Sequence, residues 1–219
     1  RMRIWNSDGS EALNCGSALR SVTAYLHNRK QLVHSRYKIK TNSGIYESFV
    51  VKSSDYYITS VALDRVSRLG LKDVGERGLV KIGQWTGFPV SVGNPHFVIF
   101  SEYGAFNKEE LATLNIKRIA EQINEDPLLP EGANIEFVVI EDKKKVQLRV
   151  WERGSGETQA CGTGACAVVY AGISLGLLEN SVELTFPGGL VEVEIDSLES
   201  GCLLSGRVDF VCDGTLYYE

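Results

Sequence analysis

Short segments rich in apolar and β-branched residues, separated by clusters of turn residues, make up most of the chain and predict strands. Segments 37–42, 45–52 and 56–63 are separated by Ser43-Gly44 and by Ser53-Ser54-Asp55, a pattern that predicts an antiparallel meander. Further strands are expected at 79–82, 88–92, 97–100, 134–140, 146–151, 181–186, 190–195 and 201–211.

Apolar residues at helical spacing predict three helices. Leu19, Val22 and Leu26 mark an amphipathic helix near the start of the chain, and the run 165–170 indicates a second helix that follows a glycine-rich loop. The segment 108–124 carries an apolar stripe with acidic residues in its first turn, which predicts one helix that two prolines end. This third helix is expected to cover the strands rather than to carry chemistry.

Composition and charge restrict the classes of partner. The 219 residues are 43% hydrophobic, which is enough for one large domain or two small ones with sizeable cores. A net charge of -5 argues against a nucleic-acid partner, because phosphate contacts require a basic surface. The basic run Lys143-Lys144-Lys145 lies between two expected strands and is interpreted as a solvated hairpin turn. The sequence has no apolar stretch that could span a bilayer and no leader, so we expect a soluble protein without a membrane partner.

Five cysteines at irregular spacing do not make the even-numbered framework of a secreted disulfide protein. They also lack the Cys-x-x-Cys spacing of zinc sites, and no His-x-x-x-His pair accompanies them. We therefore expect no metal and a reducing, cytoplasmic location. The cysteines are Cys15, Cys161, Cys166, Cys202 and Cys212.

Candidate chemistry lies in the stretch 151–166, where four glycines surround a cysteine ahead of the second predicted helix. At that position the unpaired N–H groups and the positive end of the helix dipole favour an anion, so the pKa of the Cys161 thiol is expected to fall. The N–H groups of Gly162, Thr163 and Gly164 are also expected to hold a substrate carboxylate. Alternatively, Cys161 is a small buried apolar residue, although the flanking glycines favour a functional role.

A similar arrangement occurs at 6–20, where a glycine-containing loop and Cys15 precede the first predicted helix. Each of the two cysteines is followed by glycine and preceded, four residues earlier, by glutamate. We interpret this as an internal duplication, with two like half-molecules that each offer one cysteine at a helix N-terminus. Two cysteines that face each other across a cleft suit the transfer of a proton from one face of a carbon atom to the other.

Several motifs follow one another in a fixed order over nearly the whole chain. They are Asn6 to Glu11 with Cys15-Gly16, Gly93-Asn94-Pro95-His96, Asn134-Ile135-Glu136-Phe137, Glu152 to Gly164, and Pro187-Gly188-Gly189. With these motifs the chain resembles the diaminopimelate epimerase family, whose members are amino-acid epimerases and racemases of the two-cysteine type. The resemblance implies an isomerase that needs no cofactor and interconverts LL- and meso-diaminopimelate in the biosynthesis of lysine and peptidoglycan precursors.

The resemblance also implies an α+β fold of two pseudo-symmetric half-domains, each a mostly antiparallel, β-barrel-like sheet around a central helix. The active site is expected in the cleft between them. Residues 1–61 and 207–219 would form the N-terminal half-domain, and residues 62–206 the C-terminal one. Family members carry a further N-terminal portion with an active-site loop, which the resemblance implies is absent here. Exposed sheet edges of such a fold often pair, so a homodimer is compatible with it.

By resemblance, Cys15 and Cys161 are the catalytic pair and exchange the roles of base and acid with the handedness of the substrate. His96 and Glu152 are expected beside them, where they adjust the protonation of the thiols. The guanidinium of Arg153 could bind a substrate carboxylate through two parallel hydrogen bonds. The expected substrate-binding residues are Asn6, Gly16, Ser17, Asn94, Asn134, Glu152, Arg153, Gly162 and Thr163.

Structural interpretations compete with several of these roles. His96 could pack beside Pro95 in a turn, and Asn94 could cap that turn. Glu152 and Arg153 could form a surface ion pair of little energetic weight. The cysteines outside the motifs are expected to be ordinary buried residues.

One departure from the family concerns the residues after Cys15-Gly16. The family usually has Asn-Gly there, whereas this chain has Ser17-Ala18. Serine reaches less far than asparagine, and Ala18 restricts the backbone if a left-handed conformation is needed. Two alternatives therefore stay open. They are a racemase of another amino acid, such as histidine, proline or hydroxyproline, and a non-catalytic or thiol-redox binding protein.

Overall fold

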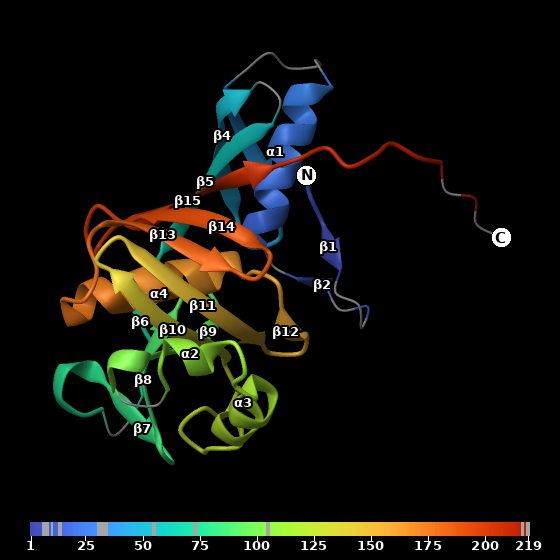
Figure 1. Cartoon of the computed structure of the whole chain (residues 1–219). Helices are drawn as coiled ribbons and strands as arrows, with labels where there is room; N and C mark the ends of the chain where they lie inside the picture. The colour runs from blue at the N-terminus through green and yellow to red at the C-terminus, as the bar shows by residue number, and fades with distance from the viewer. Residues whose placement is uncertain are drawn as a thin grey trace.

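The computed structural model of the chain describes residues 1–5, 9, 11–12, 15–29, 35–53, 56–71, 74–103, 106–215 and 217. Within these ranges one large mixed sheet of thirteen strands organises the molecule. Neighbouring strands follow the order β3-β4-β5-β15-β14-β13-β11-β10-β9-β8-β6, while β12 pairs with β11 and β7 pairs with β8 (Figure 1).

The strands of this sheet agree closely with the segments expected from the sequence. A two-stranded sheet of β1 (Ile4–Trp5) and β2 (Glu11–Ala12) accompanies it. The large sheet contains β3 (Arg36–Lys40), β4 (Ile45–Ser53), β5 (Tyr57–Arg65), β6 (Ser67–Arg68), β7 (Val80–Ile82), β8 (Trp85–Ser91), β9 (Pro95–Phe100), β10 (Asn134–Asp142), β11 (Lys145–Glu152), β12 (Gly156–Thr158), β13 (Ser181–Phe186), β14 (Gly189–Glu194) and β15 (Gly201–Val208).

The helices are few and cover the sheet. They are α1 (Gly16–Asn28), α2 (Lys108–Leu111), α3 (Ile116–Asn124) and α4 (Gly162–Leu175), with short 3-10 turns at Glu76–Gly78 and Ser101–Tyr103. The chain is therefore a mixed α+β protein, as expected. None of the helices in the described ranges is long and apolar enough to cross a membrane.

The antiparallel meander predicted after the first helix is confirmed, because β3 pairs with β4 and β4 with β5 in antiparallel register. The predicted hairpins are also present. The turn between β10 and β11 contains Lys143 and Lys144, and β13 and β14 form a hairpin around Pro187-Gly188. Local turn chemistry was sufficient for these predictions, because each partner strand lies next in the chain.

The sheet is less uniformly antiparallel than expected. β9 lies parallel to β10, and β11 lies parallel to β13. Both parallel pairs are joined by long connections that contain helices, α2 and α3 in the first case and α4 in the second. Parallel neighbours require such a crossover, whereas a short turn returns the chain antiparallel.

The prediction of one helix over 108–124 is wrong. The chain forms α2 and α3 instead, and each has its own asparagine cap. Asn107 makes a capping box with Glu110, and the Asn115 side chain accepts a hydrogen bond from the N–H of Arg118. The apolar residues keep their helical spacing from α2 into α3, because both helices bury one side against β10 and its neighbours. Periodicity alone therefore missed the second N-cap.

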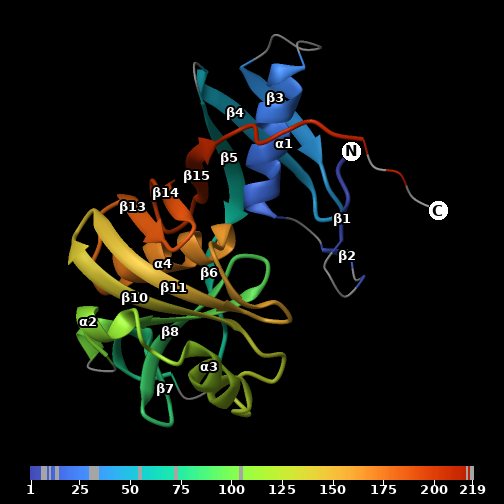
Figure 2. The same ribbon diagram turned by 45° about the vertical axis from the view of Figure 1, so that its right-hand side comes forward.

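The two helices that follow the cysteines lie at different parts of the sheet. α1 packs on β4, β5 and β15, and α4 packs on β8, β9, β10, β14 and β15. Figure 2 shows β3 and β4 beside α1, well separated from β10 and α2. β15 is the strand that both helices contact, and the N-terminal ends of α1 and α4 approach each other over it.

Candidate active site

Cys161 is the N-cap residue of α4, which begins at Gly162, earlier than the apolar run indicated. Its backbone is extended, with φ -131° and ψ 116°, and its sulfur accepts a hydrogen bond from the N–H of Gly164 at 3.4 Å. The hydroxyl of Thr163 lies 3.4 Å from the same sulfur. The thiol therefore occupies the place of a capping oxygen, where helix N–H groups converge.

Cys15 holds the same position on α1. It is the N-cap residue, with φ -155° and ψ 113°, and α1 begins at Gly16. Its side chain makes no capping hydrogen bond and is more exposed than that of Cys161. The sequence similarity between the two cysteine segments thus corresponds to the same local structure at both helix starts.

The glycine after each cysteine lets the two helix ends touch. A Cβ atom at Gly162 would lie 3.6 Å from Cα of Gly16 and 2.8 Å from Cδ2 of Leu204 on β15. A Cβ atom at Gly16 would lie 2.9 Å from the same Leu204 atom and 3.9 Å from Cα of Gly162. The two backbones are therefore within van der Waals reach of each other, and a side chain at either glycine would press on the end of the Leu204 side chain.

This contact places both cysteines on one cavity of about 580 Å³. Nine of the twelve predicted site residues line this cavity, while Gly16 lies between two of the lining residues, His96 lies behind the cavity wall and Asn6 falls outside the described residues. The nine are Cys15, Ser17, Asn94, Asn134, Glu152, Arg153, Cys161, Gly162 and Thr163. Both cysteines therefore line one shared cavity.

The expectation that the Cys161 thiol has a lowered pKa is wrong. Burial is the main cause that raises its pKa well above the ordinary value, and the negative charges of Glu152 and Glu136 raise it further. The hydrogen bonds from Thr163 and Gly164 oppose this effect without cancelling it. Only 6% of Cys161 is exposed, so the loss of hydration outweighs the helix end.

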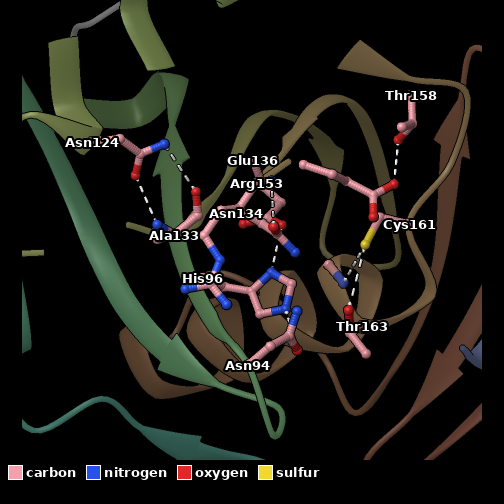
Figure 3. Close-up of polar contacts among 12 residues, drawn as sticks. Asn94, His96, Asn124, Ala133, Asn134, Glu136, Arg153, Thr158, Cys161 and Thr163 are labelled. Atoms are coloured by element: carbon pink, nitrogen blue, oxygen red, sulfur yellow. Dashed lines mark hydrogen bonds and ion pairs between the residues drawn. The ribbon is translucent and has the colours of Figure 1, made fainter. Parts of the chain in front are cut away.

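Glu152 and Arg153 do not form an ion pair with each other in the described part of the chain. Glu152 accepts a short hydrogen bond from the Thr158 hydroxyl on β12. Arg153 donates from Nη1 to the backbone oxygen of Glu131 at 2.5 Å, and its N–H donates to Oδ1 of Asn134 at 2.8 Å. Both residues line the cavity next to the β11–β12 hairpin, which argues against the surface-pair interpretation. Figure 3 shows Arg153 beside Asn134.

His96 belongs to β9 and is fully buried. Its Nε2 atom lies 3.1 Å from Oδ1 of Asn94, and its Nδ1 atom lies 2.7 Å from Oε1 of Glu136. Figure 3 shows the imidazole between these two side chains, with Cys161 and Thr163 nearby. His96 is therefore held in a polar network behind the cavity wall rather than packed in a turn.

Sequence reasoning missed Glu136 as a site residue, although it lies within one of the quoted motifs. The carboxylate is fully buried on β10, in a strand whose neighbours are mostly apolar. A charged residue inside an apolar strand is the signal that could have identified it, because such a group is rarely buried without a partner. The structure also adds Ser43, Tyr46 and Asp64 to the cavity lining.

Some of the remaining predictions about this region agree with the structure and others do not. Ala18 lies inside α1, and it is not among the residues with positive φ, so the alanine causes no strain there. Cys166 and Cys202 are buried as expected, but Cys212 is exposed. Among the described residues, no group of three His, Cys, Asp or Glu side chains could hold a metal ion.

Comparison with solved structures defines the class of fold. The chain aligns over 96% of its length with 79% of a protein described as a predicted epimerase from Pseudomonas aeruginosa, with a TM-score of 0.68 and 14% identity. It aligns over 96% of its length with 71% of a probable proline racemase from Agrobacterium radiobacter K84, with a TM-score of 0.66 and 15% identity. The fold is thus that of the epimerases and racemases related to proline racemase.

Sequence comparison then gives the family. The diaminopimelate epimerase model matches residues 88–211. The diaminopimelate epimerase of Parabacteroides distasonis is 35% identical over 216 residues, which cover 97% of this chain and 76% of that protein. The chain belongs to the diaminopimelate epimerase family and is an isomerase of that family.

Proposed function

We propose that this protein interconverts LL- and meso-diaminopimelate by proton transfer between two cysteines at the substrate α-carbon. The observation that carries the proposal is the single cavity onto which Cys15 and Cys161 both open, each from the N-terminus of its own helix. A substrate carbon held between two sulfurs can lose a proton to one of them and gain a proton from the other on its opposite face. That sequence of events inverts the stereocentre.

The reaction needs one thiolate and one thiol at the start. The thiolate takes the α-proton, the electron pair of the C–H bond moves into the α-carboxylate, and the opposite thiol then protonates the carbon. The thiol that donated becomes the thiolate, so the enzyme is ready for the other stereoisomer. Burial and the nearby carboxylates keep the pKa of Cys161 high, which supports Cys161 as the thiol in the resting enzyme.

The developing negative charge on the substrate must be stabilised without pyridoxal phosphate. The N-termini of α1 and α4 supply this, because their first N–H groups converge on the cavity. We assign the α-carboxylate to the N–H groups of Gly16, Gly162 and Thr163, with the Thr163 hydroxyl as a further donor. These dipoles are fixed before the substrate arrives, so little reorganisation is needed during proton transfer.

The other polar side chains of the cavity are proposed to hold the rest of the substrate. Asn94, Asn134 and Arg153 line the cavity and offer donors and acceptors to a second amino-acid group. Glu152 and His96 are proposed to adjust the protonation of the cysteines, and the proximity of Glu152 to Cys161 supports the first of these roles. Asn6 and Ser17 complete the proposed substrate-binding set.

We also propose that residues 1–61 with 207–219, and residues 62–206, act as the two half-domains between which the substrate binds. The packing of α1 on β4 and β5 and of α4 on β8, β9 and β10 supports this division. A cytoplasmic enzyme is consistent with the five free cysteines.

Incubation of the protein with LL-diaminopimelate in deuterated water tests the function. The expected product is meso-diaminopimelate that carries one deuterium at the inverted α-carbon, and Cys161→Ala is expected to abolish its formation. Formation of this product at the same rate by the variant would remove the assignment of Cys161.

A panel of amino acids, scored by chiral chromatography, tests the choice of substrate. The shorter side chain of Ser17 on the cavity wall is the feature that favours a different amino acid. Inversion of histidine or proline without inversion of diaminopimelate would establish a racemase of another specificity. Absence of inversion with every member of the panel would favour a binding protein.

A further inference from the structure

Glu136 is a carboxylate in an unusual place. It lies on β10 between Ile135 and Phe137, and the residue is 0% exposed. A buried carboxylate loses its hydration and must be compensated by charges or hydrogen-bond donors. Its Oε2 atom has no hydrogen-bond partner in the described part of the chain. Packing alone therefore does not explain why a carboxylate occupies this buried position.

One side of the carboxylate contacts His96. The Oε1 atom lies 2.7 Å from Nδ1 of His96, so a single proton lies between the imidazole and the carboxylate. On the other side of the ring, Nε2 lies 3.1 Å from Oδ1 of Asn94, which lines the cavity. Glu136 thus fixes the orientation of an imidazole that reaches the cavity through one intervening side chain.

The same oxygen atom of the carboxylate also lies beside the start of α4. A Cβ atom at Gly164 would lie 2.7 Å from Oε1 of Glu136 and 3.2 Å from Cβ of Cys161. The N–H of Gly164 is the group that donates to the Cys161 sulfur at 3.4 Å. The Glu136 carboxylate and the Cys161 sulfur therefore lie close to the same glycine, and that glycine leaves the room for the carboxylate.

The charge of Glu136 acts on Cys161 at this short range. A carboxylate near a thiol disfavours the thiolate, and the pKa of Cys161 is raised by burial first, then by Glu152, and then by Glu136. Glu152 is on the cavity wall, where a bound substrate can screen or displace its charge. Glu136 is enclosed by protein and does not line the cavity, so a bound substrate does not contact it.

We propose that Glu136 is a positioning residue for the epimerase reaction, which orients His96 and holds Cys161 in the thiol form required of a proton donor. The proposal rests on the proposed function of Cys161. Glu136 itself does not touch the substrate, because it does not line the cavity.

The variant Glu136→Gln separates charge from shape. Glutamine keeps an oxygen that can accept from Nδ1 of His96, but it removes the negative charge beside Gly164. The rate of Cys161 alkylation by iodoacetamide, followed by peptide mass spectrometry at pH 8, is expected to rise at least about tenfold. The alkylation rate of Cys15 is expected to change less than about twofold, because Glu136 acts on the other cysteine.

The pH profile of kcat/KM gives a second readout that a purely structural role would not move. The alkaline limb, where the donor thiol loses its proton, is expected to shift to lower pH in Glu136→Gln. Glu183→Gln is the matched control, because that carboxylate is on an exposed part of β13 with its side chain 43% exposed. It should leave both the alkylation rates and the pH profile unchanged.

The variant Glu136→Asp is a second test of the charge effect, and it can replace Glu136→Gln if the glutamine variant fails to fold. Aspartate keeps the charge but withdraws it by one methylene group, so an intermediate alkylation rate is expected. An unchanged Cys161 rate in a folded Glu136→Gln or Glu136→Asp protein would overturn the proposal. Alkylation does not depend on turnover. Absence of epimerase activity in the unsubstituted protein would therefore contradict the proposed function, while a faster alkylation of Cys161 in Glu136→Gln would leave the charge effect standing.

Discussion

The starts of α1 and α4 have the same backbone design but opposite electrostatic surroundings. Cys15 and Cys161 are both N-cap residues, and both are followed by a glycine that makes the contact between the helices. Cys161 lies near the carboxylates of Glu136 and Glu152, whereas a buried guanidinium, that of Arg20, lies within electrostatic reach of Cys15. The two copies of the motif therefore differ in the charged groups that surround their cysteines.

Arg20 is the counterpart of Glu136 in this comparison. It is only 6% exposed, and its Nε and Nη1 atoms have no hydrogen-bond partner among the described residues. Burial lowers the pKa of the guanidinium, while a negatively charged Cys15 raises it. Nη1 is directed at the backbone of Gly206 on β15, where a Cβ atom would lie only 2.5 Å away. The buried guanidinium of Arg20 is therefore the charged group that distinguishes the surroundings of Cys15 from those of Cys161.

The largest expected effect follows from removal of either sulfur. Cys15→Ala and Cys161→Ala should each reduce the rate of epimerisation by at least about 10³-fold, because each removes one of the two groups that exchange the proton. The double variant should be no more than about threefold slower than either single variant, since the two sulfurs act as a unit. Chiral chromatography of the product measures the rates. A single variant that still inverts the α-carbon at a tenth of the normal rate would show that its cysteine is dispensable.

The next largest effect concerns the contact between the helices. Gly162→Ala places a methyl group 2.8 Å from Cδ2 of Leu204, so the leucine side chain or the start of α4 must shift, beside a backbone contact with Gly16 that is already at van der Waals distance. A displacement near 1 Å between reacting groups can cost about 10²-fold in rate, and we expect a decrease of about 10- to 100-fold in kcat. The overpacking should lower the free energy of unfolding by about 1–3 kcal/mol.

Leu204→Val provides the control for this contact, because it removes one methylene from the side chain that both glycines touch. The combination Gly162→Ala with Leu204→Val should recover part of the lost rate. If Gly162→Ala alone keeps full activity, the close approach of the two helix ends is not needed for catalysis.

The pH dependence of thiol reactivity sharpens the comparison further. Because burial and two carboxylates raise the pKa of Cys161, more of it stays protonated at any given pH, and only the thiolate is alkylated. In the folded protein its alkylation rate should still rise about tenfold per pH unit through pH 9, whereas in urea it should level near about pH 8.5. Peptide mapping measures both curves. A plateau below that pH in the folded protein would mean that the helix end outweighs burial.

The smallest expected effect is that of Arg20→Met. Loss of the cation should reduce the alkylation rate of Cys15 by roughly three- to tenfold and leave that of Cys161 unchanged. The free energy of unfolding should stay constant or increase, because an apolar residue replaces an unpaired buried charge. Arg29→Met, at the other end of α1 and paired with Asp213 at the surface, is the control. Equal rates for Cys15 in both variants would remove the proposed asymmetry.

Much of the local structure was predictable because it depends on neighbours in the chain. The hairpins around Lys143-Lys144 and Pro187-Gly188, the meander from β3 to β5, and the helices after both cysteines all follow from turn residues and periodicity. The separate caps of α2 and α3 were missed, since the apolar stripe passes through the break without interruption. The parallel pairs β9–β10 and β11–β13 depend on crossovers, which turn chemistry does not encode.

The sequence by itself determined the catalytic candidates and their local geometry, because a cysteine followed by glycine at a helix start is a short-range pattern. The other candidates came from the family resemblance, and nine of the twelve candidates line one cavity that the tertiary structure assembles. Only the tertiary structure decided the charge around each sulfur. Glu136 and Arg20 reach their positions through β10 and α1, and the depth of burial that reverses the expected pKa shift of Cys161 depends on the whole sheet. Hydration and long-range charge are properties of the packed molecule, so no local pattern in the chain could supply them.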